Sequence, residues 1–138
     1  GYIDRIDSPS NGVVRVIDYK TGKVNDEEFN IEEGKEEKVA DALFLKDNDD
    51  RPKITLQMFL YDEWAKKHWK SVENSIYSPS DLFVNDVRSY PFNEKFNSLV
   101  KEGLSKTLEE MADVSVPFRR TENEKTCERC DFKMICGR

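Results

Sequence analysis

An acid and a base stand close together at the end of an apolar run near the start of the chain. Asp18 and Lys20 follow a run of mostly β-branched residues, and Thr21 and Gly22 come next as a turn. Residues i and i+2 of a strand point to the same side, so the two charges share one face about 7 Å apart along the chain. A second acid, Asp4, lies in the preceding run. Two carboxylates beside a lysine are the residue types of a divalent-metal site with a cation built in.

Such a group of residues suits hydrolysis of a phosphodiester bond. The reaction needs a nucleophilic hydroxide at neutral pH and a cation that absorbs negative charge, and Mg²⁺ (or Mn²⁺) held by one or two carboxylates provides both. Asp4 and Asp18 are the candidate carboxylates, and the carbonyl of Tyr19 could complete the metal shell. Lys20 could orient or deprotonate the attacking water. The alternative is an ordinary strand-end ion pair, which contributes less than about 1 kcal/mol at a surface.

Two paired strands must position these groups. The apolar residues of 13–17 predict a strand that is covered on both faces, and the run 1–7 predicts a second strand. The intervening Ser, Pro, Asn and Gly residues of 8–12 predict a turn, so the two strands should form a hairpin. In that hairpin Asp4 and Asp18 can meet at one edge of the sheet.

Three helices are expected to follow, over 36–45, 52–69 and 93–113, with strand fragments at 75–80 and 82–84. The last helix has the clearest apolar stripe, formed by Phe96, Val100, Leu104, Leu108 and Met111. The pattern predicts an α/β fold, with a small mixed central β-sheet flanked by helices and the hairpin at its centre.

Two residues of the expected helix 93–113 have predicted effects on it. Asn93 can cap the last helix, and Gly103 is expected to weaken the middle of it. The length of 138 residues fits one domain, which we divide into a core over 1–113 and a tail over 114–138. Because the chain opens at Gly1 inside an expected strand, we expect a fragment of a longer protein that is truncated at its N-terminus.

The charge balance is weak guidance to a partner. A net charge of −6 argues at first sight against nucleic acid, because phosphate binding depends on Lys and Arg. The acids concentrate in 26–50, however, and a separate basic set consists of Lys66, Lys67, Lys70, Arg119, Arg120 and Arg129. No stretch approaches the roughly 20 apolar residues of a membrane span, and no secretory signal is visible, so we expect a cytoplasmic protein with no membrane partner.

The two runs with their acids and lysine resemble a known family. Gly1-Tyr2-Ile3-Asp4, followed by Val16-Ile17-Asp18-Tyr19-Lys20-Thr21, resembles the nuclease domains of the PD-(D/E)XK superfamily, specifically its RecB and AddB branch. The resemblance implies a restriction-endonuclease-like core in which Asp4 and Asp18 bind metal and Lys20 is catalytic. Asp7 and Arg5 also match the AddB-like first motif, although Arg5 could simply pair with an acid.

A second motif of the family lies on the expected helix 52–69. The family places Q-x-x-x-Y there, and this chain has Gln57 and Tyr61, which share one helical face. Without the first motif, a buried polar pair would be the preferred interpretation. The resemblance implies a Mg²⁺-dependent deoxyribonuclease, with exonuclease favoured over endonuclease, that acts on DNA in repair or recombination beside a helicase domain or subunit.

The three cysteines form the pattern C-x2-C-x5-C in the tail. Cys127, Cys130 and Cys136 stand within ten residues of one another, and an odd number of thiols disfavours a disulfide framework. Crowded thiolates suit zinc or an iron–sulfur cluster, which normally take four ligands. The resemblance implies a [4Fe-4S] cluster whose fourth cysteine lies far upstream, so we expect this chain not to hold the complete cluster. Incidental cysteines remain the alternative.

Two further classes of function stay open. The first is a catalytically inactive DNA-binding or scaffolding module stapled by the cysteine site, and the second is a zinc-binding interaction domain organised by the tail. His68 is the only histidine. It lies among lysines near the end of a helix, so we expect it at the surface and assign it no role.

Overall fold

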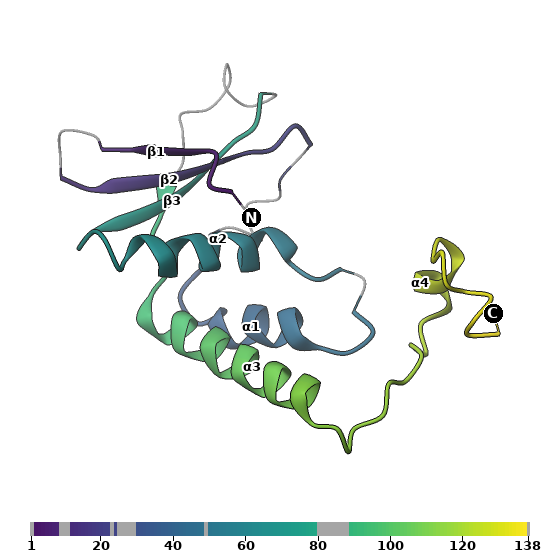
Figure 1. Ribbon diagram of the computed structural model, residues 1–138. Helices are drawn as coiled ribbons and strands as arrows, with labels where there is room; N and C mark the ends of the chain where they lie inside the picture. The colour runs from purple at the N-terminus through teal and green to yellow at the C-terminus, as the bar shows by residue number, and fades with distance from the viewer. Residues whose placement is uncertain are drawn as a thin grey trace.

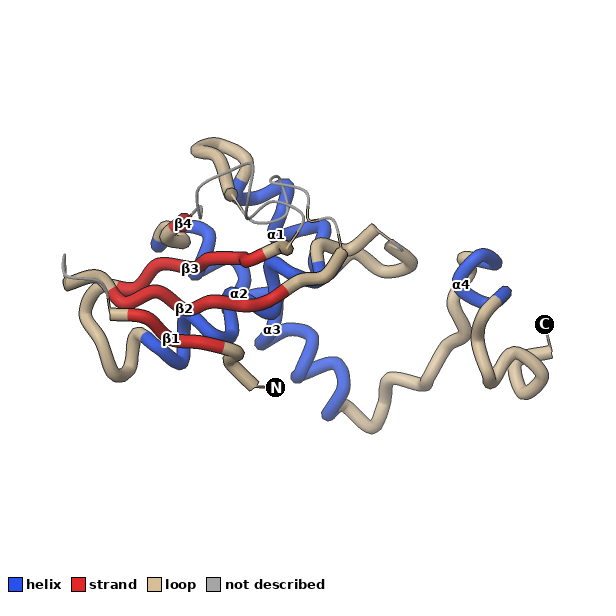
Figure 2. The backbone as a smooth tube through the Cα atoms, turned by 90° about the horizontal axis from the view of Figure 1, so that it is seen from above, coloured by secondary structure: helices blue, strands red, loops and turns tan. Residues whose placement is uncertain are grey.

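The central feature of the fold is a mixed four-stranded β-sheet. The computed structural model describes residues 2–8, 12–22, 24, 30–48, 50–79 and 89–137. Its strands are β1 (Arg5–Asp7), β2 (Val14–Tyr19), β3 (Val72–Tyr77) and the short β4 (Ser89–Tyr90), in the order β1-β2-β3-β4. β2 pairs antiparallel with β1 and parallel with β3, and β3 pairs antiparallel with β4. The expected hairpin is therefore present, and Figure 2 shows β1, β2 and β3 side by side. The prediction that the hairpin lies at the centre of the sheet was wrong for β1, which is an edge strand, whereas β2 lies between β1 and β3.

Four helices accompany the described strands, namely α1 (Glu36–Phe44), α2 (Lys53–Ala65), α3 (Glu94–Ala112) and the one-turn α4 (Glu124–Glu128). Figure 1 shows α2 against the sheet, with α1 and α3 on the far side of α2 and α4 on an extended tail. A parallel pair needs a long crossover, and α1 and α2 lie in the connection from β2 to β3. The predicted small α/β fold with a mixed sheet and flanking helices is confirmed.

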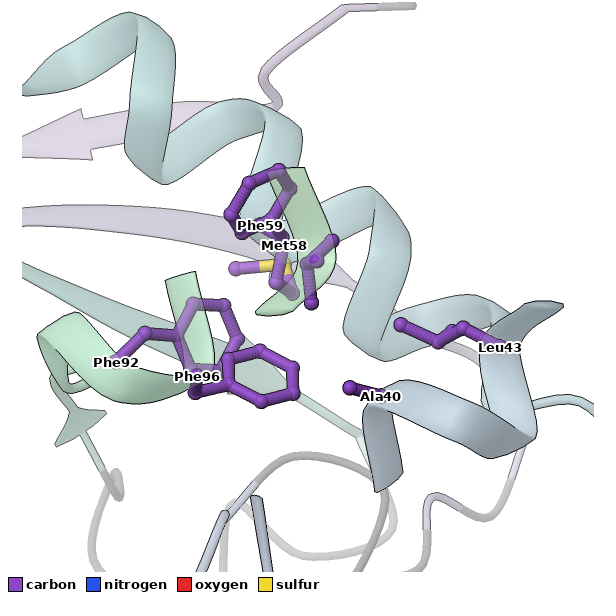
Figure 3. Close-up of a cluster of buried hydrophobic side chains, with 7 residues drawn as sticks. Ala40, Leu43, Met58, Phe59, Phe92 and Phe96 are labelled. Carbon is purple, nitrogen blue, oxygen red and sulfur yellow. The ribbon is translucent and has the colours of Figure 1, made fainter. Parts of the chain in front are cut away.

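The hydrophobic core lies on both sides of α2. Toward α1 and α3 it contains Ala40, Leu43, Met58, Phe59, Phe92, Phe96 and Val100, as Figure 3 shows for the labelled residues. Toward the sheet, Ala65 of α2 packs with Val16 of β2 and Val72 of β3. Because α2 is buried on two sides, its position relative to the sheet is fixed by packing.

α1 and α3 approach closely at Gly103. A Cβ atom built on Gly103 would lie 2.3 Å from the ring of Phe44, far inside the contact distance of two carbon atoms. The glycine that was expected to weaken the helix therefore makes room for the aromatic ring of α1. Asn93 caps α3 as predicted, because its side chain accepts a hydrogen bond from the Phe96 N–H.

Several boundaries differ from those predicted. The helix predicted over 52–69 ends at Ala65, after which the N–H groups of Lys67 and His68 bond carbonyls only three residues back, in tight turns. β3 begins at Val72, earlier than the predicted 75–80, and the predicted fragment 82–84 lies outside the described residues.

The apolar stripe of α3 is buried only in its first half. Phe96 and Val100 are fully buried, whereas Leu108 and Met111 are 61% and 76% exposed. The predicted apolar stripe therefore extends beyond the packed part of the helix, because α3 is longer than the α1 helix it packs against. No helix among the described residues is long and apolar enough to cross a bilayer.

Candidate active site

The C-terminal end of β2 brings Asp18 and Lys20 together. Asp18 lies on the same strand face as Val16, and this face meets α2, so its carboxylate is only 2% exposed. The Lys20 ammonium nitrogen lies 2.6 Å from Asp18 Oδ2. The lysine is half-buried, and its backbone N–H bonds the Tyr77 carbonyl of β3, which fixes its position at the strand end.

Gln57 of α2 joins both charged groups. Its amide nitrogen Nε2 donates to Asp18 Oδ1 at 2.8 Å, and its oxygen Oε1 accepts from the Lys20 ammonium at 2.8 Å. A neutral amide can satisfy an acid and a base at once, since it carries both a donor and an acceptor. Asp18, Lys20 and Gln57 therefore form a closed set of contacts between the strand end and the helix.

Tyr61 extends this network to the N-terminal segment. Gln57 Nε2 also donates to the Tyr61 hydroxyl at 2.9 Å, and that hydroxyl donates to the Tyr2 carbonyl at 2.5 Å. Gln57 and Tyr61 thus point together from one face of α2, as their spacing predicts.

Asp4 lies beside the same strand end. Arg5 is the Cα partner of Ile17, so Asp4 is one residue past the paired segment and opposite Asp18. Its Oδ2 accepts a hydrogen bond of 2.8 Å from the backbone N–H of Tyr19. Tyr19 is the last residue of β2, and its ring packs against Tyr77 with 5.8 Å between centroids.

Arg5 is engaged by neighbours within the hairpin. Its Nε donates to Asp7 Oδ1 at 2.7 Å. The pKa of the guanidinium is raised above its ordinary value, first by its hydrogen bond with Tyr19 and then by Asp7. The simpler interpretation of Arg5, that it pairs with an acid, is the one the structure supports.

The donor set fits a hard divalent cation. Asp18 Oδ2 is a buried oxygen with no hydrogen-bond partner among the described residues, its contact with Lys20 being an ion pair. Asp4 supplies a second carboxylate at the same strand end. The described residues contain no group of three or more His, Cys, Asp or Glu arranged to hold a metal ion. Mg²⁺ takes one or two protein carboxylates together with water and phosphate oxygens, so two acids are enough.

The three cysteines are not gathered into a metal site in the described structure. Cys127 lies in α4, and the Cys130 N–H bonds its carbonyl at 3.1 Å, whereas Cys136 is exposed and its carbonyl accepts from Arg120. All three are free thiols. The [4Fe-4S] cluster that the resemblance implies, which this chain was not expected to complete, is unsupported by this arrangement of the described residues.

A buried polar pair that the sequence analysis missed fixes α2 against β3. Asp62 and Asn74 are both fully buried, and Asn74 Nδ2 donates to Asp62 Oδ1 at 3.2 Å. The Lys66 ammonium reaches Asp62 Oδ2 at 2.5 Å. Burial raises the pKa of Asp62, and Lys66 opposes that shift. The sequence signal was a polar Asn at the alternate position between Val72 and Ile76 of β3. In the sheet Asn74 lies directly across from Val16.

Comparison with known proteins bears on what this strand end does. The family model described as the PD-(D/E)XK nuclease superfamily matches residues 1–137. The chain belongs to the PD-(D/E)XK nuclease superfamily. No curated protein and no solved structure gives a significant match.

Members of the PD-(D/E)XK nuclease superfamily are typically nucleases, which supports a hydrolase activity for this chain. Nucleases of this superfamily use divalent metals. The match covers the hairpin, α2 and the tail alike, so the strand end with Asp18 and Lys20 lies within the family's domain. It does not separate one branch of the superfamily from another.

Proposed function

We propose that this chain is a divalent-metal-dependent deoxyribonuclease of the RecB and AddB branch, with its active site at the C-terminal end of β2. One observation carries the proposal. The Lys20 ammonium is held between Asp18 and Gln57 at 2.6 and 2.8 Å, so an acid, a base and an orienting amide converge at one strand end. A surface ion pair would leave the lysine mobile and the acid exposed, whereas Asp18 is buried.

Each residue of the site has a role in the proposal. Asp4, Asp18 and the Tyr19 carbonyl would hold Mg²⁺ or Mn²⁺. When bound, the cation supplies Lewis-acid activation of the scissile phosphate and lowers the pKa of water. Lys20 orients the attacking water and offsets the negative charge that develops on the phosphate oxygens.

Gln57 and Tyr61 complete the set as holding groups. Gln57 keeps the lysine directed toward Asp18, because it donates to the acid and accepts from the base. Tyr61 keeps Gln57 in place and ties the N-terminal segment to α2 through the Tyr2 carbonyl. Preorganised donors of this kind lower a barrier because they need not reorient during the reaction.

The finer parts of the proposal rest on sequence patterns. The D-Y-K motif with Gln57 and Tyr61 supports the RecB and AddB branch, and with it an exonuclease that acts on DNA in repair or recombination beside a helicase domain or subunit in the cytoplasm. The spacing of Cys127, Cys130 and Cys136 is the support for a [4Fe-4S] cluster in the full-length protein. Iron and zinc analysis of that protein distinguishes a cluster from a zinc site.

The test of the nuclease proposal compares two lysine variants. In the full-length protein with Mg²⁺, Lys20→Ala should lose cleavage of DNA by about 10²-fold or more, as expected for a group that acts in the transition state, while DNA binding is nearly unchanged. Lys46→Ala is the matched control, since Lys46 is exposed and pairs with Glu110 away from the site. DNA binding without Mg²⁺-dependent cleavage in the unmodified protein would contradict the proposal and favour an inactive DNA-binding module.

A further inference from the structure

Three aromatic rings gather on the surface at the C-terminal end of α2. The ring centroids of Trp64 and His68 are 4.7 Å apart, those of His68 and Trp69 are 5.7 Å apart, and those of Trp64 and Trp69 are 6.0 Å apart. Trp64 and Trp69 are 44% and 36% exposed. We call these three residues the ring cluster. Such large rings bury most of their surface when they serve only the core, so the exposed faces of the ring cluster are available to a ligand.

The ring cluster continues the face of α2 that carries the candidate active site. Gln57, Tyr61 and Trp64 occupy positions i, i+4 and i+7, which lie on one side of a helix. At 1.5 Å per residue, Trp64 is about 4.5 Å beyond Tyr61 along the axis. Figure 1 shows this end of α2 leading into β3, at the opposite end of the molecule from α4. A strand that leaves the active site along this face of α2 would reach the ring cluster next.

The charge around the ring cluster favours a polyanion. Lys67 and Lys70 are exposed and directly precede His68 and follow Trp69 in the sequence, respectively. Lys66 is paired with the buried Asp62. The chain as a whole carries a net charge of −6, so a lysine-rich surface is a local exception. Aromatic rings bordered by cations are the surface on which unpaired bases stack while their phosphates are neutralised.

We propose that the ring cluster is a stacking site for the unpaired bases of a single-stranded stretch of DNA that leads away from the scissile bond, since Trp64 lies about 10 Å along α2 from Gln57. This inference rests on the proposed nuclease function and adds its substrate class. Unpaired bases expose both faces, whereas bases of a duplex are already stacked on one another, so the ring cluster selects single strands.

The ring cluster can be read directly by fluorescence, because Trp64 and Trp69 are the only two tryptophans among the 138 residues. Oligo(dT) added to the chain in EDTA should quench the tryptophan emission in a saturable way. An abasic oligonucleotide of the same length has the same phosphates without bases, and it should quench much less. A blunt duplex should also quench much less. Equal quenching by all three would overturn the stacking site.

Variants then connect the quenching to affinity. With labelled oligo(dT) and fluorescence anisotropy, Trp64→Ala or Trp69→Ala should weaken binding by about 5- to 150-fold, the range for loss of one stacked base. Trp69→Tyr keeps a stacking ring and should restore most of the affinity. Phe132→Ala is the matched control, because Phe132 is a similarly exposed ring in the tail. Unchanged affinity in both alanine variants would contradict the proposal.

The contribution of Lys67 and Lys70 is tested by the salt dependence of the affinity. Lys67→Gln and Lys70→Gln should each reduce the slope of log affinity against log salt by about one contact, that is by about 0.7 for a single strand. Lys53→Gln, at the opposite end of α2, should leave the slope unchanged. Equal effects at all three positions would mean that the lysines beside the rings have no special role.

Failure of this inference differs from failure of the nuclease proposal. Binding and quenching are measured in EDTA, where no cleavage takes place, so neither readout depends on the chemistry of the candidate active site. Quenching without any Mg²⁺-dependent cleavage would retain the stacking site and remove the nuclease. Cleavage without base-dependent quenching would retain the nuclease and remove the stacking site. Rings shielded at high protein concentration by self-association, with no response to DNA, would assign the ring cluster to a second copy and overturn the proposal.

Discussion

Lys20 is held by one charged and one neutral partner. The buried carboxylate of Asp18 compensates its charge, and Gln57 Oε1 directs the ammonium without adding a second negative charge. Hydrogen bonds to charged groups are worth about 1.5–3 kcal/mol each. The amide of Gln57 makes two such bonds, so its removal should affect the site more than removal of the Tyr61 hydroxyl.

Gln57→Ala and Tyr61→Phe separate these contributions. Gln57→Ala should lower kcat for DNA cleavage by about 10- to 100-fold, because it releases both Lys20 and Asp18. Tyr61→Phe removes the bonds to Gln57 and the Tyr2 carbonyl and should cost less than about 10-fold. Thermal unfolding of both variants serves as the control for folding. A kcat for Gln57→Ala within twofold of the unmodified protein would exclude the holding role.

Asp62 gives a stability prediction at the same scale. Asp62→Asn keeps an oxygen for Asn74 and removes a buried charge, so the free energy of unfolding at pH 7 should change by less than about 1 kcal/mol or increase. Asp62→Ala leaves the buried Asn74 amide without its acceptor and should cost about 2–3 kcal/mol. Urea denaturation of the two variants measures both values, and equal losses would contradict the account.

The stability of the unmodified protein should depend on pH in a way that the stability of Asp62→Asn does not. Because burial raises the pKa of Asp62, the folded state binds this proton more tightly than the unfolded state. The free energy of unfolding of the unmodified protein should therefore fall as the pH rises from the ordinary value of 3.8 through the raised pKa, and Asp62→Asn should lack this fall. If the stability difference between the two proteins did not change with pH, the raised pKa of Asp62 in the folded state would be refuted.

At the scale of elements, the sequence predicts what depends on local pattern. The β-branched run of β2, its hairpin with β1, and the cap at Asn93 were all predictable, since strand propensity, turn residues and capping act over a few residues. The contacts between elements that are far apart in the sequence were not predictable. Asp62 and Asn74 are 12 residues apart, and the sequence around each residue does not indicate that the two side chains are buried against one another.

The candidate site was predictable for a different reason. Its residues could be named because their types and spacing match a known motif, while the contacts of Gln57 with Asp18 and Lys20 depend on how α2 packs on β2. The exposed end of α3 shows the limit of periodicity. Leu108 continues the apolar stripe, but a stripe does not reveal whether a partner element is long enough to cover it.

The close packing of α1 and α3 at Gly103 can be tested by the stability of Gly103→Ala. Gly103→Ala raises intrinsic helix propensity by about 1 kcal/mol, but the new methyl group would collide with the Phe44 ring. Overpacking typically costs about 1–3 kcal/mol, so we expect a net loss of stability in urea denaturation. Ser105→Ala, on the exposed face of α3, is the control and should be neutral or slightly stabilising. A stabilised Gly103→Ala protein would show that α1 and α3 do not pack this closely.

At the scale of the whole molecule, α2 links the core to the candidate site. Its Met58 and Phe59 pack toward α1 and α3, its Ala65 packs on the sheet, and its Gln57 reaches the end of β2. The tail is held more lightly, by contacts of Thr121 and Asn123 with Asp47. We therefore expect the geometry of the strand end to depend on the packing of α2 rather than on the tail.

The central claim is that the acid and the lysine at the end of β2 carry out metal-dependent cleavage of DNA. The most direct measurement is the rate of DNA cleavage by the full-length protein with Mg²⁺, for the unmodified protein and for Asp18→Asn. The amide keeps the shape of the side chain and an acceptor for Gln57, but it removes the negative charge. We predict a loss of about 10²-fold or more with DNA binding retained. Thermal unfolding of the variant is the control for folding, because Lys20 loses the charge that compensates its own. Undiminished Mg²⁺-dependent cleavage by Asp18→Asn would contradict the account.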